Sequence, residues 1–340
     1  MSSADTTLGA AAASALPRRP ARLWLTGWAA GLLWAAVGVL TLSWPNQEVG
    51  FKEWGYTREF GLAALAGAAA LALAASSGVA HRSWPLARKL HRAGPWLVLL
   101  AVLVGIWETV TAKLALLPSP FFAPPQSLIE IYIGDWKRLL DSLLNSLWLL
   151  ANGYVLGAIS GFITGVAIGW SRGLGYWVHP LLRFLGPVPS TALLPMAFFF
   201  FPSSWAAAVF LIALATWFPV TVLTWSGVAG VNRAFYDVAR TLGADARFLI
   251  FRVAIPAALP HVFVGLFMGL GASFSVLVAA EMMGVKSGLG FYLSWAQGWA
   301  SYANMYGALI VMALTFSGLI TLLFAVRDRL LAWQKGVVKW

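Results

Sequence analysis

Residues 236–260 read YDVARTLGADARFLIFRVAIPAALP, a polar and basic segment that lies between two strongly apolar stretches of the chain. The sequence as a whole is apolar: 60% of its 340 residues are hydrophobic, 10% are charged, and the mean hydropathy is +0.78. This composition does not fit a water-soluble globular domain. We therefore expect a polytopic membrane protein from which residues 236–260 project into water.

The apolar stretches on either side predict an all-α fold. A helix needs roughly 20 apolar residues, at about 1.5 Å of rise per residue, to cross about 30 Å of hydrocarbon. Eight stretches approach that length: residues 22–44, 59–80, 95–117, 142–169, 178–201, 204–225, 261–284 and 304–325. Gly157, Gly161 and Gly165 recur at four-residue spacing in the fourth stretch, which predicts a close helix–helix contact rather than a ligand site.

The basic residues predict the orientation of the chain, because Lys and Arg in short loops stay on the cytoplasmic side. With eight spans and both termini in the cytoplasm, sixteen Lys and Arg residues lie in inner segments. The outer segments hold five: Lys52, Arg58, Lys137, Arg138 and Lys286. We therefore expect both termini inside. The formal charge of +11 then reflects membrane topology and gives no reason to expect nucleic-acid binding.

The chain divides into unequal parts at a basic linker, His81–Gly94. We expect residues 1–21 to form a disordered cytoplasmic tail, because the first part of this segment is rich in Ala, Ser and Thr. Residues 22–94 predict a two-span hairpin followed by the linker. Residues 95–340 contain the other six spans and every distinctive motif.

Several kinds of chemistry have no support in the sequence. The chain has no Cys, and its four His residues do not have the spacing of metal ligands. No GxxxxGK[ST] pattern occurs anywhere in it. We therefore expect no catalytic residue, no metal site and no ATPase activity of its own.

The central segment predicts a helix–turn–helix on the cytoplasmic side. Arg233–Leu242 fits one short helix, Gly243 permits a break, and Ala244–Val253 fits a second helix. Pro256 and Pro260 mark the entry into the next span.

This segment resembles the cytoplasmic coupling loop of bacterial ABC importer permeases. In that loop, Glu-Ala-Ala is followed after three residues by Gly, and after nine more by Ile/Val-x-Leu/Ile-Pro. The matching positions are Asp237-Val238-Ala239, Gly243 and Val253-Ala254-Ile255-Pro256, with both gaps at the expected length. Asp replaces Glu and Val replaces the first Ala.

Four further segments are similar to the nitrate, taurine and aliphatic-sulfonate branch of these permeases. They are LPSPFFAPPQSLI at 117–129, VPSTALLPMAFFF at 188–200, FPVTVLTWSGV at 218–228 and VAAEMMGVKSGLGFYL at 278–293. The resemblance covers roughly residues 95–340 and implies a type I importer fold of about six helices. The hairpin at 22–94 is additional to the usual subunit.

The resemblance also implies partners and a mechanism. Two ATPase subunits that bind ATP-Mg would dock on the coupling loop at about 231–258, and an external solute-binding protein would deliver a small oxyanion such as nitrate, a sulfonate or taurine. The permease would form a homodimer in the lipid bilayer of a bacterial inner membrane. The expected docking residues are Asp237, Ala239, Arg240, Gly243 and Pro256. Asp237 and Arg240 either contact the ATPase or pair with each other, and Gly243 either adopts a positive φ that coupling requires or is only a helix cap.

A second set of residues is expected along the translocation path or at its gate. Glu108 and Glu281 lie in apolar stretches, where a charge is costly, and they either face the path or hold helices together. Lys113 is expected to extend to the outer membrane surface. Hydroxyl donors for an oxyanion are Ser190, Thr191, Ser273 and Ser275, although one of the last two is expected to bond back to its own helix. Gly288 and Gly290 suggest a re-entrant gate or a plain turn.

Two other classes of protein fit the composition. A secondary transporter driven by an ion gradient would show internal repeats with interrupted, charge-bearing helices near the midplane, and the 236–260 pattern has no second copy. A membrane scaffold without transport activity would leave the projecting basic loop without a partner.

Overall fold

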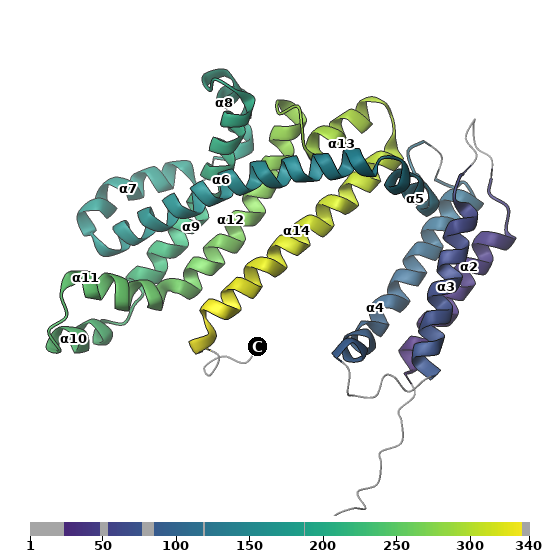
Figure 1. Cartoon of the computed structure of the whole chain (residues 1–340). Coiled ribbons are helices and arrows are strands. Elements are labelled where there is room, and N and C mark those ends of the chain that lie inside the picture. Colours follow the sequence, from purple (N-terminus) through teal and green to yellow (C-terminus); the bar gives the residue numbers. More distant parts are fainter. Residues whose placement is uncertain (1–23, 48–53, 77–84, 118–119, 187, 335–340) are drawn as a thin grey trace, which may run out of the picture. The chain divides into compact units, whose positions relative to one another are not determined.

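The computed structural model of the chain describes residues 24–47, 54–76, 85–117, 120–186 and 188–334 (Figure 1). The tail expected at residues 1–21 lies outside these ranges. Every regular element within them is helical, as the apolar pattern predicts. The chain forms two compact units, residues 1–130 and residues 131–340, and each is described by itself.

The first unit is built on a pair of apolar helices. It contains α2 (Leu25–Ser43), α3 (Thr57–Ser76) and α4 (Pro85–Glu108), which continues as the π-helical turn η2 (Thr109–Lys113). Helix α2 packs on both α3 and α4. Small residues allow the close approach to α3, because a Cβ on Gly31 would lie only 3.3 Å from the carbonyl oxygen of Ala68. Helix α4 begins at Pro85, so residues 85–94, expected as linker, are helical.

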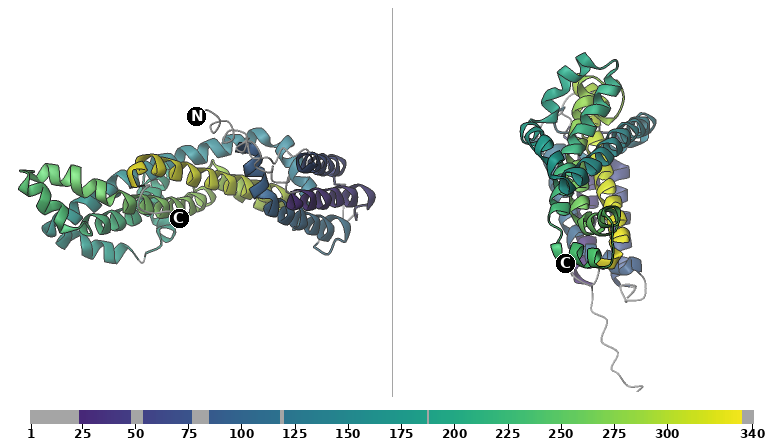
Figure 2. Two further views of the ribbon diagram at one scale, coloured as in Figure 1. Left: turned by 90° about the horizontal axis from the view of Figure 1, so that it is seen from below. Right: turned by 90° about the vertical axis from the view of Figure 1, so that its left-hand side faces the viewer.

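The second unit is a layer of long helices. After α5 (Pro125–Gly134), its elements are α6 (Trp136–Trp170), α7 (Arg172–Leu185), η3 (Ser190–Leu193), α8 (Leu194–Phe200), α9 (Ser204–Ala229), α10 (Arg233–Thr241), α11 (Ala246–Phe248), η4 (Leu249–Ala254), α12 (Ile255–Met283), α13 (Leu289–Gly298), α14 (Tyr302–Leu330) and η5 (Ala332–Gln334). Helix α9 packs against both α6 and α12 and forms the core of the unit (Figures 1 and 2).

The predicted glycine face of α6 is its contact with α9. A Cβ on Gly157 would lie 2.3 Å from the carbonyl oxygen of Ala213, and one on Gly165 would lie 2.7 Å from that of Thr221. No side chain fits at such distances, so only glycine lets the two backbones approach this closely.

Seven helices among the described residues are long and apolar enough to cross a membrane. They are Leu25–Ser43, Thr57–Ser76, Lys89–Lys113, Trp136–Trp170, Ser204–Ala229, Ala246–Met283 and Tyr302–Leu330, and each coincides with a predicted span. The remaining predicted span, residues 178–201, is bent by 84° between Arg172–Leu185 and Ser190–Phe200. Pro189 contributes to this break, since proline cannot continue a helix hydrogen-bond ladder.

The sequence prediction of a separate second helix at Ala244–Val253 is wrong. Helix α11, the π-helical turn η4 and α12 follow one another without interruption, so this stretch is the start of a span that runs from Ala246 to Met283. Pro256 lies inside this continuous stretch, directly after the π-helical turn η4, where the regular α-helical hydrogen-bond ladder is already interrupted.

Candidate functional site

Helix α10 lies at the end of the second unit opposite α13 (Figure 1), and hydrogen bonds cap both of its ends. The side chain of Asn232 accepts a hydrogen bond from Ala234 N at 3.0 Å and caps the start of α10. At the other end, Gly243 N donates to Arg240 O at 2.9 Å and Ala244 N donates to Ala239 O at 3.0 Å. These two bonds form a Schellman motif, which ends a helix in a defined direction.

Gly243 has a φ of +84° and closes the Schellman motif, so the structure fits both sequence hypotheses for this residue, a positive-φ turn and a helix cap. A Cβ built at this position would have no atom within 4 Å, so packing does not require glycine here. The backbone conformation does, because L-residues with a side chain seldom adopt a positive φ. On the far side of the turn, Asp245 Oδ1 accepts a hydrogen bond from Phe248 N at 2.8 Å and caps α11.

An exposed apolar surface lies on this turn, and we call it the α10 surface. It surrounds a depression of about 420 Å³ lined by Phe235, Val238, Ala239, Leu242, Gly243, Ala244 and Phe248. Leu242 is 83% exposed, and the side chains of Phe235 and Val238 are also largely exposed. Positions 235, 238 and 242 share one face of α10, at a three- and four-residue spacing that is visible in the sequence but does not belong to the predicted docking residues.

The opposite face of α10 is fastened to the long helices. Tyr236 packs against the cluster of Val228, Ala254 and Ala258, and its ring meets that of Trp170 edge to face at 6.0 Å. Burial raises the pKa of the Tyr236 phenol. Helix α10 is therefore packed directly against α9 and α12.

Charged residues on α10 flank the apolar surface. Asp237 and Arg240 form an ion pair at 3.8 Å in which both side chains are exposed, so they pair with each other as one of the two sequence hypotheses proposed. Further exposed arginines are found nearby at Arg233, Arg247 and Arg252.

A cleft of about 370 Å³ opens where the fifth predicted span is broken. Residues of η3, α9 and α12 line it, and it contains three hydroxyl groups, those of Ser190, Thr191 and Ser275. The other lining residues are apolar or glycine, among them Phe218 and Met268. Ser273 does not line the cleft, because its side chain is fully buried. One of Ser273 and Ser275 was expected to bond back to its own helix, and both do: Ser273 Oγ donates to Leu270 O at 2.9 Å, and Ser275 Oγ donates to Gly271 O at 3.2 Å.

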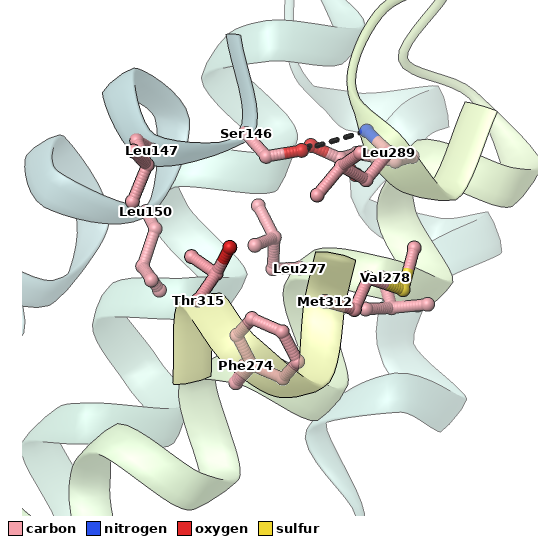
Figure 3. Close-up of a pocket in the computed structure, with 10 residues that line it drawn as sticks. Ser146, Leu147, Leu150, Phe274, Leu277, Val278, Leu289, Met312 and Thr315 are labelled. Carbon is pink, nitrogen blue, oxygen red and sulfur yellow. Dashed lines mark hydrogen bonds between the residues drawn. The ribbon is translucent and has the colours of Figure 1, made fainter. Parts of the chain in front are cut away.

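Glu281, Gly288 and Gly290 come together at the start of α13. Ser146 Oγ donates to Glu281 Oε1 at 2.6 Å, and Gly290 N donates to Glu281 Oε2 at 2.7 Å. Leu289 N donates to Ser146 Oγ at 2.8 Å (Figure 3). The adjoining cavity measures about 10 Å³, roughly the space of a single water molecule, and is too small for a solute.

Glu108 lies in the first unit, 3.7 Å from Lys113 Nζ, and neither side chain is exposed. Lys113 also donates hydrogen bonds to the carbonyl oxygens of Thr41 and Trp44 and to Asn46 Oδ1, at 2.9, 2.6 and 2.6 Å. The prediction that Lys113 extends to the membrane surface is therefore wrong. Its ammonium group is held by acceptors at the end of α2, which no local sequence pattern indicates.

The described residues contain no group of three or more His, Cys, Asp or Glu side chains placed to hold a metal ion. The features brought together by the fold are instead the exposed apolar α10 surface, a hydroxyl-lined cleft and a hydrogen-bonded carboxylate between helices.

Comparison with known proteins identifies the family of the chain. Residues 153–335 match the family described as binding-protein-dependent transport system inner membrane component. This match covers α10, the cleft and α13.

Several relatives align over most of both chains. Nitrate import permease protein NrtB from Synechococcus elongatus is 29% identical over 77% of this chain and 95% of its own length. Taurine transport system permease protein TauC from Escherichia coli is 31% identical over 75% of this chain and 94% of its own. The putative aliphatic sulfonates transport permease protein SsuC from Bacillus subtilis is 29% identical over 71% and 87%. The chain therefore belongs to the binding-protein-dependent transport system inner membrane component family and has the type I importer fold of ABC permeases.

Proposed function

We propose that this chain forms the membrane path of an ATP-driven importer and that its α10 surface docks an ATPase subunit. The observation that carries the proposal is the set of exposed apolar side chains on a short, doubly capped turn. Large apolar side chains that remain exposed together outside a membrane span favour contact with another protein. Anchors of this kind, surrounded by polar groups, are typical of binding hot spots.

The helix that follows the α10 surface supports a route for the coupled movement. The span from Ala246 to Met283 contains 38 residues, so at about 1.5 Å per residue it is roughly 57 Å long. A displacement at its first turn therefore moves the cleft residues Met268 and Ser275, which belong to the same helix. Two ATPase subunits that close on ATP-Mg would supply the displacement.

The cleft supports a small oxyanion as the transported solute. Hydroxyl groups can donate hydrogen bonds to anionic oxygens, and no Lys, Arg, Asp or Glu lies among the residues that line the cleft. Donors without a full charge would bind an anion weakly and release it readily. Selection of the solute would then rest with an external binding protein, and a homodimer of the chain would complete the path.

The distribution of basic residues supports an orientation in which both termini lie on the cytoplasmic side of a bacterial inner membrane. This orientation counts the bent pair from Arg172 to Phe200 as one crossing, which gives an even number of spans. It places α10, with its exposed arginines, on the side of the membrane where ATP is available.

A transporter driven by an ion gradient is the alternative. Such transporters contain interrupted helices, and the bent pair Arg172–Leu185 and Ser190–Phe200 of this chain is a feature of that kind. The lining residues of the cleft at this bend include no ionisable side chain that could bind a coupling proton.

Uptake by purified complex in proteoliposomes tests the proposed function. The complex would be isolated from native membranes through this chain, and uptake of labelled nitrate, taurine or an alkanesulfonate would be measured with its binding protein present. We expect uptake that requires ATP-Mg on the α10 side and persists when ionophores collapse all ion gradients. Uptake that stops with the gradients and ignores ATP would support the alternative.

A further inference from the structure

Helix α13 begins without a side-chain cap of its own. Its N-cap residue is Gly288, and no side chain near it in sequence bonds the first amides of the helix. These amides instead bond to side chains of two other helices: Leu289 N donates to Ser146 of α6, and Gly290 N donates to Glu281 of α12. Because Ser146 also donates to Glu281, three helices meet in one set of hydrogen bonds. We call this set the α13 anchor.

A carboxylate suits this position for electrostatic reasons. The start of a helix carries unpaired N–H groups and a partial positive charge, so an anionic acceptor is favoured there. Hydrogen bonds to an ionised acceptor are also stronger than those between neutral groups. Glu281 is 1% exposed and both of its oxygens accept hydrogen bonds, so it has no free oxygen for a solute.

Two glycines let the start of α13 lie directly on this carboxylate. Gly288 has φ and ψ of 100° and 173°, a conformation that is essentially restricted to glycine. A Cβ at Gly288 would lie 2.1 Å from Glu281 Oε1, and one at Gly290 would lie 2.7 Å from Val278 O. The anchor therefore depends on the absence of both side chains.

The body of α13 is held separately. Tyr292 Oη and Asn304 Nδ2 each donate to Asp135 Oδ2 at 2.9 Å, which joins α13 to the residue before α6 and to α14. None of these three residues belongs to α12. Apart from its packing on α12 and the five-residue connection 284–288, α13 is therefore linked to α12 through the carboxylate of Glu281.

We propose that Glu281 is a positioning residue for transport: it makes α13 follow α12, so that a displacement applied at α10 reaches α13 at the opposite end of α12. The inference rests on the proposed docking of an ATPase at α10. Without the anchor, α12 would still move when ATP is hydrolysed, but only packing and the connection 284–288 would link that movement to α13.

Glu281→Gln and Ser146→Ala test this role in the intact complex. Gln keeps the length of the side chain but loses the charge at the start of α13, and Ala removes the hydroxyl that joins α6 to both partners. Gly298→Ala is the matched control, because Gly298 ends the same helix and a Cβ there would have no atom within 4 Å. For each variant, recovery of the ATPase, the rate of ATP hydrolysis and uptake of labelled solute would be measured.

We expect both anchor variants to retain ATPase recovery and the rate of ATP hydrolysis within about twofold of the wild type. The amount of solute imported per ATP should fall about tenfold, because each variant loses one strong hydrogen bond. Gly298→Ala should match the wild type. Unchanged import per ATP in both anchor variants would overturn the proposal, and so would an equal loss of hydrolysis and uptake, which indicates a purely structural role. If the wild-type chain recovers no ATPase, the proposed docking itself is wrong.

Discussion

The ammonium group of Lys113 lies 2.6 Å from the carbonyl oxygen of Trp44, the residue that ends α2. A lysine at the end of η2 therefore supplies a donor to the unpaired carbonyl groups at the end of another helix, where a positive charge is also favoured. Gln47 N donates to Ala112 O at 2.8 Å beside it. These contacts fasten the N-terminal hairpin to α4 within the first unit, so the hairpin folds together with the helix that follows it.

Replacement of Lys113 by Met should destabilise the first unit by about 3 kcal/mol, because it leaves the buried carboxylate of Glu108 without its cation. Thermal unfolding of the purified protein in detergent would measure the loss. Lys286→Met, at an exposed lysine, is the control and should have no effect. The double change Lys113→Met with Glu108→Leu should recover part of the lost stability, and a single variant as stable as wild type would contradict this account.

Gly243→Ala should weaken ATPase recovery without affecting membrane insertion. Alanine at a φ of +84° costs roughly 1 to 2 kcal/mol, so the turn would shift away from the Schellman geometry although no atom clashes. Gly243→Asn should be milder, since Asn tolerates this region better. Gly318→Ala, at an open position in α14, provides the control. Equal recovery in all three variants would show that the turn conformation is not required.

Ser275→Ala should raise the KM for solute uptake about tenfold, the effect expected when one hydrogen bond to a charged group is lost. Both hydroxyls bond back to their own helix, Ser273 to Leu270 O and Ser275 to Gly271 O, but only Ser275 lines the cleft, so Ser273→Ala is a matched control. Initial uptake rates over a range of solute concentrations would distinguish the two. A larger effect at Ser273 than at Ser275 would place the path elsewhere.

Tyr236→Phe should leave coupling intact, whereas Tyr236→Ala should reduce it, because packing of the ring attaches α10 to the long helices. Burial raises the pKa of this phenol, so its contribution to stability is fully present below the ordinary tyrosine pKa of about 10 and is lost only above it. ATP hydrolysis stimulated by the binding protein should therefore depend on pH equally in wild type and Tyr236→Phe from about pH 6 to pH 9. A difference between them in that range would assign the hydroxyl a role of its own.

Local patterns in the sequence predicted the features that local chemistry determines. Gly243 could be recognised because the end of a helix requires a residue that tolerates positive φ, and the glycine repeat of α6 could be recognised because small residues at helical spacing pack closely. Positions 235, 238 and 242 show the apolar face of α10 at helical spacing as well, but the sequence does not tell such a face from one that packs against another helix of the same chain.

Long-range partners explain what the sequence could not show. Lys113 bonds to Thr41, which is 72 residues away, and in the sequence a lysine at a helix end looks the same whether it faces water or another helix. Glu281 accepts a hydrogen bond from Ser146, which is 135 residues away, so this contact depends on the packing of α6 against α12 and leaves no local pattern in the sequence. The bend between α7 and η3 likewise divides a stretch whose apolar composition predicted one span.

Recovery of an ATPase subunit with the purified chain tests the central claim most directly. The wild-type chain, Leu242→Asp and Leu330→Asp would each be tagged and isolated from native membranes. Both leucines are exposed near helix ends, but only Leu242 belongs to the α10 surface. We predict equal ATPase recovery with the wild type and Leu330→Asp, and at least a tenfold loss with Leu242→Asp, since a buried unpaired charge at the interface costs several kcal/mol. Undiminished recovery with Leu242→Asp would contradict the proposed docking surface.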